Sequence, residues 1–269
     1  MRCAAAGPGG YLMIQAALKE NVARQFSRAA HRYDKLATIQ QQIAAQAMSQ
    51  IPVQSGRLLD IGCATGSNTA LLAEKGFAAQ GVDLAPGMVE YARMRYPHLA
   101  FYEADAQHLP FSGEAFDVVF SSMALQWCQN LSQVMIEIAR ILDKGGIATL
   151  SIMTDGSFGQ LNAARRACGL AAATNAMATH QQWLAAAREA GFAVQQAQSV
   201  EYTDTFSEVL SLLRSIKAVG AGVRCDNETV SSLSRQQLKM LQNAYQQYTT
   251  PAGQLPLTYR VSHLILEKH

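Results

Sequence analysis

The sequence predicts an α/β fold: a Rossmann-like, doubly wound, mostly parallel sheet of seven strands, with an N-terminal helical segment and a helical cap inserted between the last two strands. Three observations predict it. Short apolar runs alternate with segments of helical periodicity, a glycine-containing turn follows the first apolar run, and an acidic residue follows the second. The chain of 269 residues is 49% apolar, which is enough to bury a core of this size.

The N-terminal part of the chain is predicted to be helical. Apolar side chains recur every three or four residues over 14–50, and Ile51-Pro52 ends the pattern. Residues 1–13 contain Gly7-Pro8-Gly9-Gly10, which interrupts any helix of a signal peptide, so we expect a disordered extension there. The core is expected over residues 51–206.

The first expected strand, over residues 57–61, is a short apolar run without polar alternation, as in a buried parallel strand. Seven core strands are expected in all. They cover residues 57–61, 80–83, 99–103, 116–121, 146–153, 193–202 and 257–266. The helices expected between them cover residues 69–75, 86–95, 131–142 and 181–190.

Two further helices, over 207–219 and 234–248, lie between the last two predicted strands. They are not needed to complete a sheet. We therefore expect residues 207–250 to form an inserted helical cap and residues 251–269 to return as the final strand of the core.

The charge and cysteine content argue against several classes of protein. Lys and Arg total 22 and Asp and Glu total 20, a formal charge of +2 that gives no support for nucleic-acid binding. The five cysteines are scattered and form no Cys-x-x-Cys pair, which disfavours both a metal site and a disulfide framework. No stretch of twenty apolar residues occurs. We expect a cytoplasmic protein with reduced thiols, no metal, no membrane span and no nucleic-acid partner.

The strongest motif is a glycine-containing turn after the first strand. In Asp60-Ile61-Gly62-Cys63-Ala64-Thr65-Gly66, the glycines allow a tight turn and close approach of a ligand to the backbone. Asp83 ends the next strand, where an acid accepts hydrogen bonds from ribose hydroxyl groups in dinucleotide-binding folds. A nicotinamide cofactor is poorly supported. When the Gly-x-Gly-x-x-Gly fingerprint is aligned on Gly62, it requires glycines at positions 64 and 67, where this chain has Ala64 and Ser67.

The core resembles class I methyltransferases. Gly81-Val82-Asp83-Leu84, Ala104-Asp105-Ala106, Phe116–Ser121 and Leu142–Gly146 resemble the later motifs in order, while Ala64 replaces the middle glycine of the first. The resemblance implies S-adenosylmethionine as cofactor and a set of residues that bind it. They are Asp60, Gly62, Gly66, Asp83, Leu84, Asp105, Ala106 and Ser121. Asp117, within a buried strand motif, is expected to be structural.

The residues after the fourth strand indicate the kind of methyl acceptor. Substrate-facing residues are expected there, and Ser121–Trp127 contains no His, Asp, Glu, Lys or Tyr. An acceptor of high pKa would need a general base. A carboxylate is already ionised at pH 7 and needs only orientation and removal of water.

Three segments outside the core motifs narrow the resemblance. Phe26–Asp34, Leu212–Ala221 and Leu255–Arg260 are similar to malonyl-acyl carrier protein O-methyltransferases of biotin synthesis. This resemblance implies methyl esterification of the free carboxylate of a malonyl group on acyl carrier protein.

Four residues in these segments are candidates for the catalytic site. Arg214 and Lys217 share a helix face and could bind the carboxylate or an acidic carrier. Tyr33 and Tyr259 could close the pocket. Arg260 alternates with Tyr259 along the final strand, so only one of them can face the pocket.

Two alternatives remain open from the sequence. One is a methyltransferase of a small molecule, such as a quinone precursor or a free dicarboxylic acid. The other is a non-catalytic protein that keeps the cofactor site for recognition, since fold alone does not determine activity.

Overall fold

Seven strands form one sheet in a computed structural model of the chain, which describes residues 8–173, 175–219 and 233–269. The strands are β1 (Gly56–Ile61), β2 (Phe77–Asp83), β3 (Ala100–Glu103), β4 (Phe116–Ser122), β5 (Leu142–Met153), β6 (Phe192–Phe206) and β7 (Leu255–Lys268). Their order across the sheet is β3-β2-β1-β4-β5-β7-β6, and only the pairs made by β7 are antiparallel. The predicted fold class is confirmed.

Helices cover both faces of this sheet. They are α1 (Pro8–Leu36), α2 (Thr38–Ser49), α3 (Ser67–Glu74), α4 (Pro86–Arg95), α5 (Leu131–Ile141), α6 (Gly159–Ala167), α7 (His180–Glu189), α8 (Val209–Ala218) and α9 (Arg235–Tyr245), with the 3-10 turns η1 (Leu125–Trp127) and η2 (Gln246–Tyr248). On one face α5 and α7 pack against Leu59, and on the other α2 and α3 pack against Leu58. Adjacent strand residues point to opposite faces, so β1 is buried on both sides.

The strand order reverses between β1 and β4. The chain first winds outward from β1 through β2 to β3, then returns to place β4 on the other side of β1. In doubly wound sheets, ligands bind beyond the carboxyl ends of the strands at such a switch point. The glycine turn that follows β1 lies at this place.

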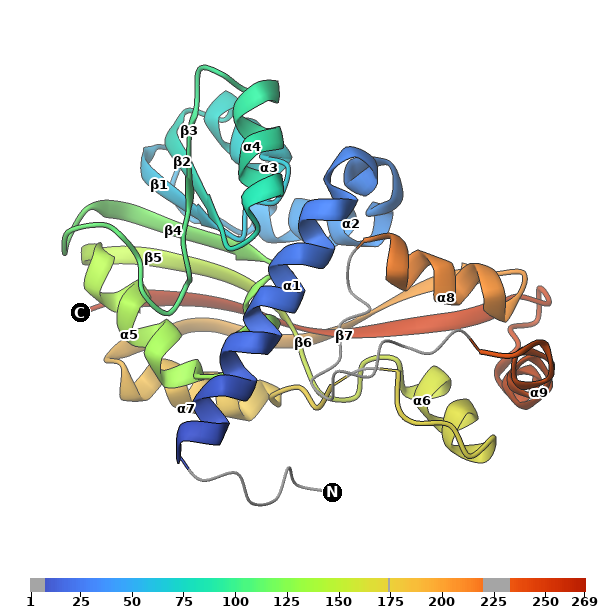
Figure 1. Ribbon diagram of the computed structural model, residues 1–269. Coiled ribbons are helices and arrows are strands. Elements are labelled where there is room, and N and C mark those ends of the chain that lie inside the picture. The colour runs from blue at the N-terminus through green and yellow to red at the C-terminus, as the bar shows by residue number, and fades with distance from the viewer. Residues whose placement is uncertain (1–7, 174, 220–232) are drawn as a thin grey trace.

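The N-terminal helical segment differs from the prediction in two respects. It is two helices, α1 and α2, separated at Ala37, and the break lets α2 bury Ile43 while α1 crosses in front of the sheet (Figure 1). Residues 8–13 of the extension predicted over residues 1–13 lie in α1. Proline is tolerated in a first helical turn, where its missing N–H has no partner within the helix. Residues 1–7 lie outside the described part of the chain.

Helix α6, between β5 and α7, is absent from the prediction. The stretch carries Gly156, Ser157 and Gly159, which favour loops, yet the nine-residue helix buries Leu161 and Ala164 at helical spacing. It packs against α9 and β7.

The inserted helices α8 and α9 lie between β6 and β7 in the chain, as predicted. Residues 220–232 of the expected cap lie outside the described residues. β5 pairs with β7 only over Val261–Glu267, so Leu255–Arg260 extends beyond β5, paired with β6 alone. Figure 1 shows α6, α8 and α9 beside these extended ends.

The described residues contain no helix with both the length and the apolar character that crossing a bilayer requires. Within the same residues, no three His, Cys, Asp or Glu side chains gather in a way that could hold a metal ion. Cys63, Cys128 and Cys168 are free thiols.

Candidate active site

Glycines shape the turn from β1 into α3. Gly62 and Gly66 have φ angles of +77° and +80°, a region that residues with a Cβ rarely adopt. A Cβ on Gly62 would lie 2.1 Å from the Cβ of Ala124, and one on Gly66 would lie 2.7 Å from the Phe101 ring. Ala64 takes the left-handed conformation, at φ +48°, despite its Cβ. The backbone geometry of the usual glycine motif is therefore kept where the middle glycine is lost.

Asp83, at the end of β2, holds this turn in place. Its Oδ2 accepts a hydrogen bond from the N–H of Ala64 at 2.9 Å, and its Oδ1 accepts one from Ala85 at 2.8 Å. Burial raises the pKa of the carboxyl group, and the main-chain donors partly oppose that rise. Each carboxylate oxygen has a further lone pair, so Asp83 can still accept hydrogen bonds from a ligand.

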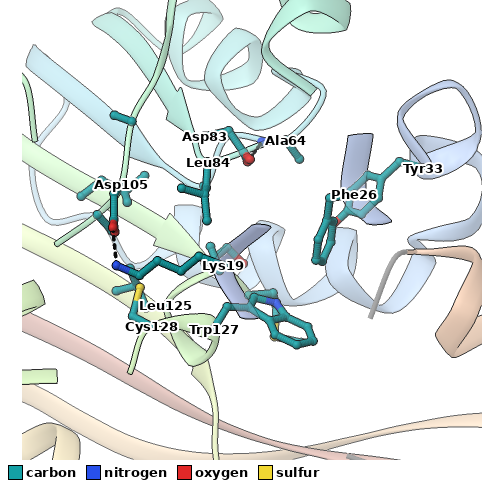
Figure 2. A pocket seen from close by; sticks show the side chains of 17 residues that line it. Lys19, Phe26, Tyr33, Ala64, Asp83, Leu84, Asp105, Leu125, Trp127 and Cys128 are labelled. Carbon is teal, nitrogen blue, oxygen red and sulfur yellow. Dashed lines mark hydrogen bonds and ion pairs between the residues drawn. The ribbon is translucent and has the colours of Figure 1, made fainter. Parts of the chain in front are cut away.

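A first cavity lies over the glycine turn (Figure 2). Its walls come from α1, from the turn itself, from the ends of β2 and β3, and from residues 122–128. The Nζ of Lys19, on α1, lies 2.6 Å from Oδ2 of Asp105, which follows β3. This ion pair connects α1 to the core at one side of the cavity.

Six of the predicted site residues line the first cavity. They are Tyr33, Gly62, Asp83, Leu84, Asp105 and Ala106. These residues follow three neighbouring strands or come from α1, and the fold brings them together. The residues present therefore fit a nucleoside ligand. Asp83 and Asp105 provide two carboxylates at neighbouring strand ends, and the turn leaves no room for a side chain at Gly62.

Asp60, Gly66 and Ser121 lie behind the cavity wall. Asp60 is only 1% exposed and accepts a hydrogen bond from the Thr69 hydroxyl at 2.7 Å. The Ser121 hydroxyl donates to the Ile61 carbonyl at 2.7 Å. Gly66 precedes α3 and packs against Phe101 rather than facing the cavity. The side chains of Asp60 and Ser121 thus support the turn from beneath, and the cofactor contacts that the resemblance implies for these three residues stay predictions.

Asp60 is expected to make the protein less stable as the pH rises. Burial raises the pKa of its carboxyl group to about 7, from an ordinary value of 3.8. Between these values the folded chain keeps a proton that the unfolded chain has lost, so the free energy of unfolding falls with increasing pH. Over about three pKa units the fall is about 4 kcal/mol. We expect Asp60→Asn to lose much less stability than the wild type between pH 5 and pH 8 in urea unfolding. An equal loss in both proteins would contradict this assignment.

A second cavity adjoins the first. Four residues line both, namely Phe26, Tyr33, Met123 and Trp127. Tyr259, on the extended part of β7, lines the second cavity and packs edge-on against Phe158 with ring centroids 4.8 Å apart. From α8, Ile216 contributes to the same cavity. Helix α8 therefore forms part of its wall.

The two tyrosines of the second cavity remain protonated at neutral pH. Burial raises the pKa of Tyr33 well above its ordinary range, and the Asp83 and Asp34 carboxylates raise it further. Burial likewise raises the pKa of Tyr259. Among the described residues that line this cavity there is no Asp, Glu, His, Lys or Cys. The described part of its lining thus offers hydrogen-bond donors but no general base.

The cations predicted near the substrate lie elsewhere. Arg214 and Lys217 are exposed on α8 and line neither cavity. They do not line the cavity that Tyr33 and Tyr259 share, and their contact with the carrier stays a prediction. Arg260 pairs with Glu201 at 2.7 Å, on the face of β7 opposite Tyr259. The predicted alternation of Tyr259 and Arg260 is thus seen, with Tyr259 facing the cavity.

Lys19, Phe26, Met123 and Trp127 line the cavities but were not among the predicted site residues. Lys19, Phe26 and Tyr33 are seven residues apart, so they lie on one face of α1, and Figure 2 shows all three beside the cavity. The repeated spacing is a signal for this face, although it does not reveal what the face covers. Met123 and Trp127 follow β4, and their exposure to both cavities depends on η1, for which the sequence carries no clear signal.

Comparisons with known proteins agree with this geometry. Residues 59–150 match the family model described as a methyltransferase domain. The chain is 34% identical over 260 residues to the malonyl-[acyl-carrier protein] O-methyltransferase of Herminiimonas arsenicoxydans, covering 93% of this chain and 96% of that one. It is 30% identical over 249 residues to the protein of the same name from Pectobacterium atrosepticum, covering 92% and 96%. It is 35% identical over 255 residues to the biotin biosynthesis bifunctional protein BioHC of Cellvibrio japonicus, with 93% of this chain covering only 50% of that longer protein.

Solved structures agree on the fold. The YcgJ protein of Bacillus subtilis matches with a TM-score of 0.57 at 19% identity, covering 84% of this chain and 97% of that one. A geranyl diphosphate C-methyltransferase of Streptomyces coelicolor, solved with S-adenosyl-L-homocysteine, matches with a TM-score of 0.52 at 13% identity, covering 84% and 78%. The full-length relatives are similar enough to show the family as well. The chain belongs to the malonyl-[acyl-carrier protein] O-methyltransferases, within the class I S-adenosylmethionine-dependent methyltransferases.

Proposed function

We propose that this protein transfers the methyl group of S-adenosylmethionine to the free carboxylate of malonyl-acyl carrier protein, and that the ester primes biotin synthesis in the cytoplasm. The observation that carries the proposal is the lining of the second cavity, which holds two protonated tyrosines and no general base among its described residues. A carboxylate ionises near pH 4 and needs no base, whereas a hydroxyl acceptor does.

The first cavity would hold the cofactor. When bound, S-adenosylmethionine supplies a methyl group on a positively charged sulfur, which a nucleophile can displace. Asp83 would accept hydrogen bonds from the ribose hydroxyl groups, and Asp105 from the adenine amine. Leu84 and Ala106 would border the adenine. Gly62 would allow the ligand to approach the backbone, because a side chain there has no room.

The second cavity would orient the carboxylate without neutralising it. Tyr33 and Tyr259 would donate hydrogen bonds from their neutral hydroxyl groups. A cation beside the carboxylate would stabilise the negative charge most strongly before transfer, when that charge is largest. Because the charge disappears as the ester forms, such stabilisation would raise the barrier. Neutral donors position the carboxylate and raise the barrier to methyl transfer less than a cation would. The apolar lining excludes water.

Mass spectrometry of the carrier protein tests the proposal. Malonyl-acyl carrier protein incubated with the enzyme and S-adenosylmethionine should gain the mass of one methylene group, and alkaline hydrolysis should remove it. Acetyl-carrier protein, which lacks the free carboxylate, should gain nothing. Methylation of free malonate but not of the carrier would favour a small-molecule enzyme. Cofactor binding without any methyl transfer would favour a recognition protein.

We expect the exposed cations of the cap to serve the carrier protein. The face of α1 opposite the cavity carries Arg24, Arg28 and Arg32, all exposed, and α1 contacts α8, which carries Arg214 and Lys217. Carrier proteins are acidic, so these cations would steer their encounter. The double variant Arg214→Ala/Lys217→Ala should raise the KM for malonyl-carrier protein about fivefold at low salt, with cofactor affinity unchanged.

Salt and a matched control separate this role from others. The increase in KM should shrink at 0.5 M salt, because exposed charges are then screened. Lys75→Ala/Arg188→Ala removes the same charge from exposed positions on α7 and after α3, and should behave like the wild type. A KM that is unchanged in the cap variant, or raised equally in the control, would count against carrier docking at α8.

A further inference from the structure

Residues around the two cavities carry unpaired polar atoms. Six buried side-chain nitrogen or oxygen atoms of the described residues have no hydrogen-bond partner, and three of them belong to residues that line the two cavities or a recess between them. They are Gln40 Oε1, Ser122 Oγ and Gln126 Oε1. A buried oxygen without a partner is unfavourable, so each of these sites calls for a ligand atom or a water molecule.

Gln126 is the most specific of the three because its amide is fixed. Its Nε2 donates to the main-chain carbonyl of Met123 at 2.6 Å. A carbonyl can only accept, so the nitrogen must face Met123 and Oε1 must face away from it. A serine hydroxyl can donate or accept, and the Gln40 amide makes no hydrogen bond in the described residues that would fix it. The unpaired atom of Gln126 is therefore an acceptor, and its partner must be a donor.

The proposed substrate carries only one kind of donor that suits this atom. The carboxylate and the thioester carbonyl of a malonyl thioester can only accept hydrogen bonds. The first N–H group is that of the amide two methylene groups beyond the sulfur, on the arm that carries the malonyl group. Free malonate has no N–H group. An acceptor in this cavity would thus distinguish a carrier-bound malonyl group from the free acid.

We infer that Gln126 is a specificity-determining residue that accepts a hydrogen bond from the first amide N–H of the thioester arm. This inference rests on the proposed function. Tyr33 and Tyr259 supply donors for the carboxylate end of the substrate, and Gln126 supplies the acceptor for the arm. The apolar residues Phe26, Met153 and Phe158 line the same cavity and suit the methylene groups between these ends.

A pair of small substrates isolates this hydrogen bond. One is the malonyl thioester of N-acetylcysteamine, which carries the amide. The other is the same molecule with the amide N–H replaced by an ester oxygen, which has the same shape but no donor. The wild type should use the amide substrate with a kcat/KM about tenfold higher, because the ester leaves Oε1 unpaired. Gln126→Met keeps the length of the side chain without the acceptor, so its two kcat/KM values should be nearly equal.

Gln247→Met is a matched control. Gln247 lies at the middle of η2, as Gln126 lies at the middle of η1, and its Nε2 donates to the carbonyl three residues earlier, Ala244, at 3.0 Å. It is exposed and lies outside both cavities. This variant loses the same local hydrogen bond and should keep the tenfold preference. Because the preference is a ratio within one protein, partial unfolding of a variant does not alter it.

The outcomes separate this inference from the proposed function. On malonyl-carrier protein, Gln126→Met should lower kcat/KM about tenfold while its affinity for S-adenosylmethionine, measured by calorimetry, stays within twofold of the wild type. A wild type without preference, or a Gln126→Met variant that retains it, overturns the inference alone. A tenfold loss of cofactor affinity in Gln126→Met also overturns it, since the donor would then belong to the cofactor. A wild type that methylates neither thioester nor carrier protein overturns the proposed function, and the inference with it.

Discussion

Replacing Gly62 by valine is expected to abolish measurable binding of S-adenosylmethionine. The φ angle of +77° is strained for any residue with a Cβ, and the added Cβ would lie 2.1 Å from that of Ala124. The branches of valine would also occupy the edge of the first cavity. Calorimetric titration should show binding at least about 100-fold weaker, equivalent to about 3 kcal/mol.

Two further variants separate loss of the ligand site from loss of the fold. Ala64→Gly relieves the left-handed strain at φ +48° and should bind like the wild type. Gly62→Val/Ala124→Gly removes the closest steric conflict. If the double variant melts at a temperature close to that of the wild type but still fails to bind, the valine acts on the ligand. Normal affinity in a folded Gly62→Val protein would show that the glycine turn does not hold the cofactor.

Asp83→Ala should weaken cofactor binding at least about tenfold. Hydrogen bonds to a charged group contribute about 1.5–3 kcal/mol each, and the variant removes the acceptors proposed for the ribose. It also removes the two main-chain contacts, to Ala64 and Ala85, that shape the turn. Asp83→Asn keeps one oxygen acceptor and should give an intermediate affinity. Both variants are measured by the same titration.

Asp117→Asn is the matched control for the charge. The Arg57 guanidinium donates to the Asp117 carboxylate at 2.9 and 3.1 Å, and the Arg57 main-chain N–H donates to it at 2.7 Å. These hydrogen bonds, the guanidinium ones first, hold the pKa of Asp117 at about 2. It lines neither cavity. Its replacement removes the same negative charge from the core motifs and should leave cofactor affinity unchanged. If Asp83→Ala binds as tightly as this control, the ribose contact lies elsewhere.

The order of the core elements could be predicted from the sequence because it depends on local signals. Apolar runs such as Leu58-Leu59 predict buried strands, and a turn with glycines at Gly62 and Gly66 has few alternative conformations. Parallel strands also place their carboxyl ends at one edge, so Asp83 and Asp105 could be expected beside the turn. These features need no knowledge of distant contacts.

The second cavity could not be predicted in the same way, because it is assembled from distant segments. Tyr33 and Tyr259 come from opposite ends of the chain, and they line one cavity only because α1 folds over the site and β7 extends past β5. The face of α8 was open to prediction. Ile216 belongs to its apolar stripe and points inward, which leaves Arg214 and Lys217 outside. The resemblance pointed to Ser121, whereas Ser122 lines the first cavity. The two serines point to opposite faces of the sheet, and the sequence does not show which face meets the cavity.

Helix α1 forms a wall of both cavities, and this has a consequence for the reaction cycle. Among the described residues, its polar contacts with the rest of the chain include Lys19 with Asp105, Ser27 with Gly87, and Asp34 with Thr65 and Arg95. The demethylated cofactor and the esterified arm must both depart from beneath this one helix. We therefore expect both products to be released together in one opening motion of α1, and we expect this motion to be the rate-limiting step of turnover.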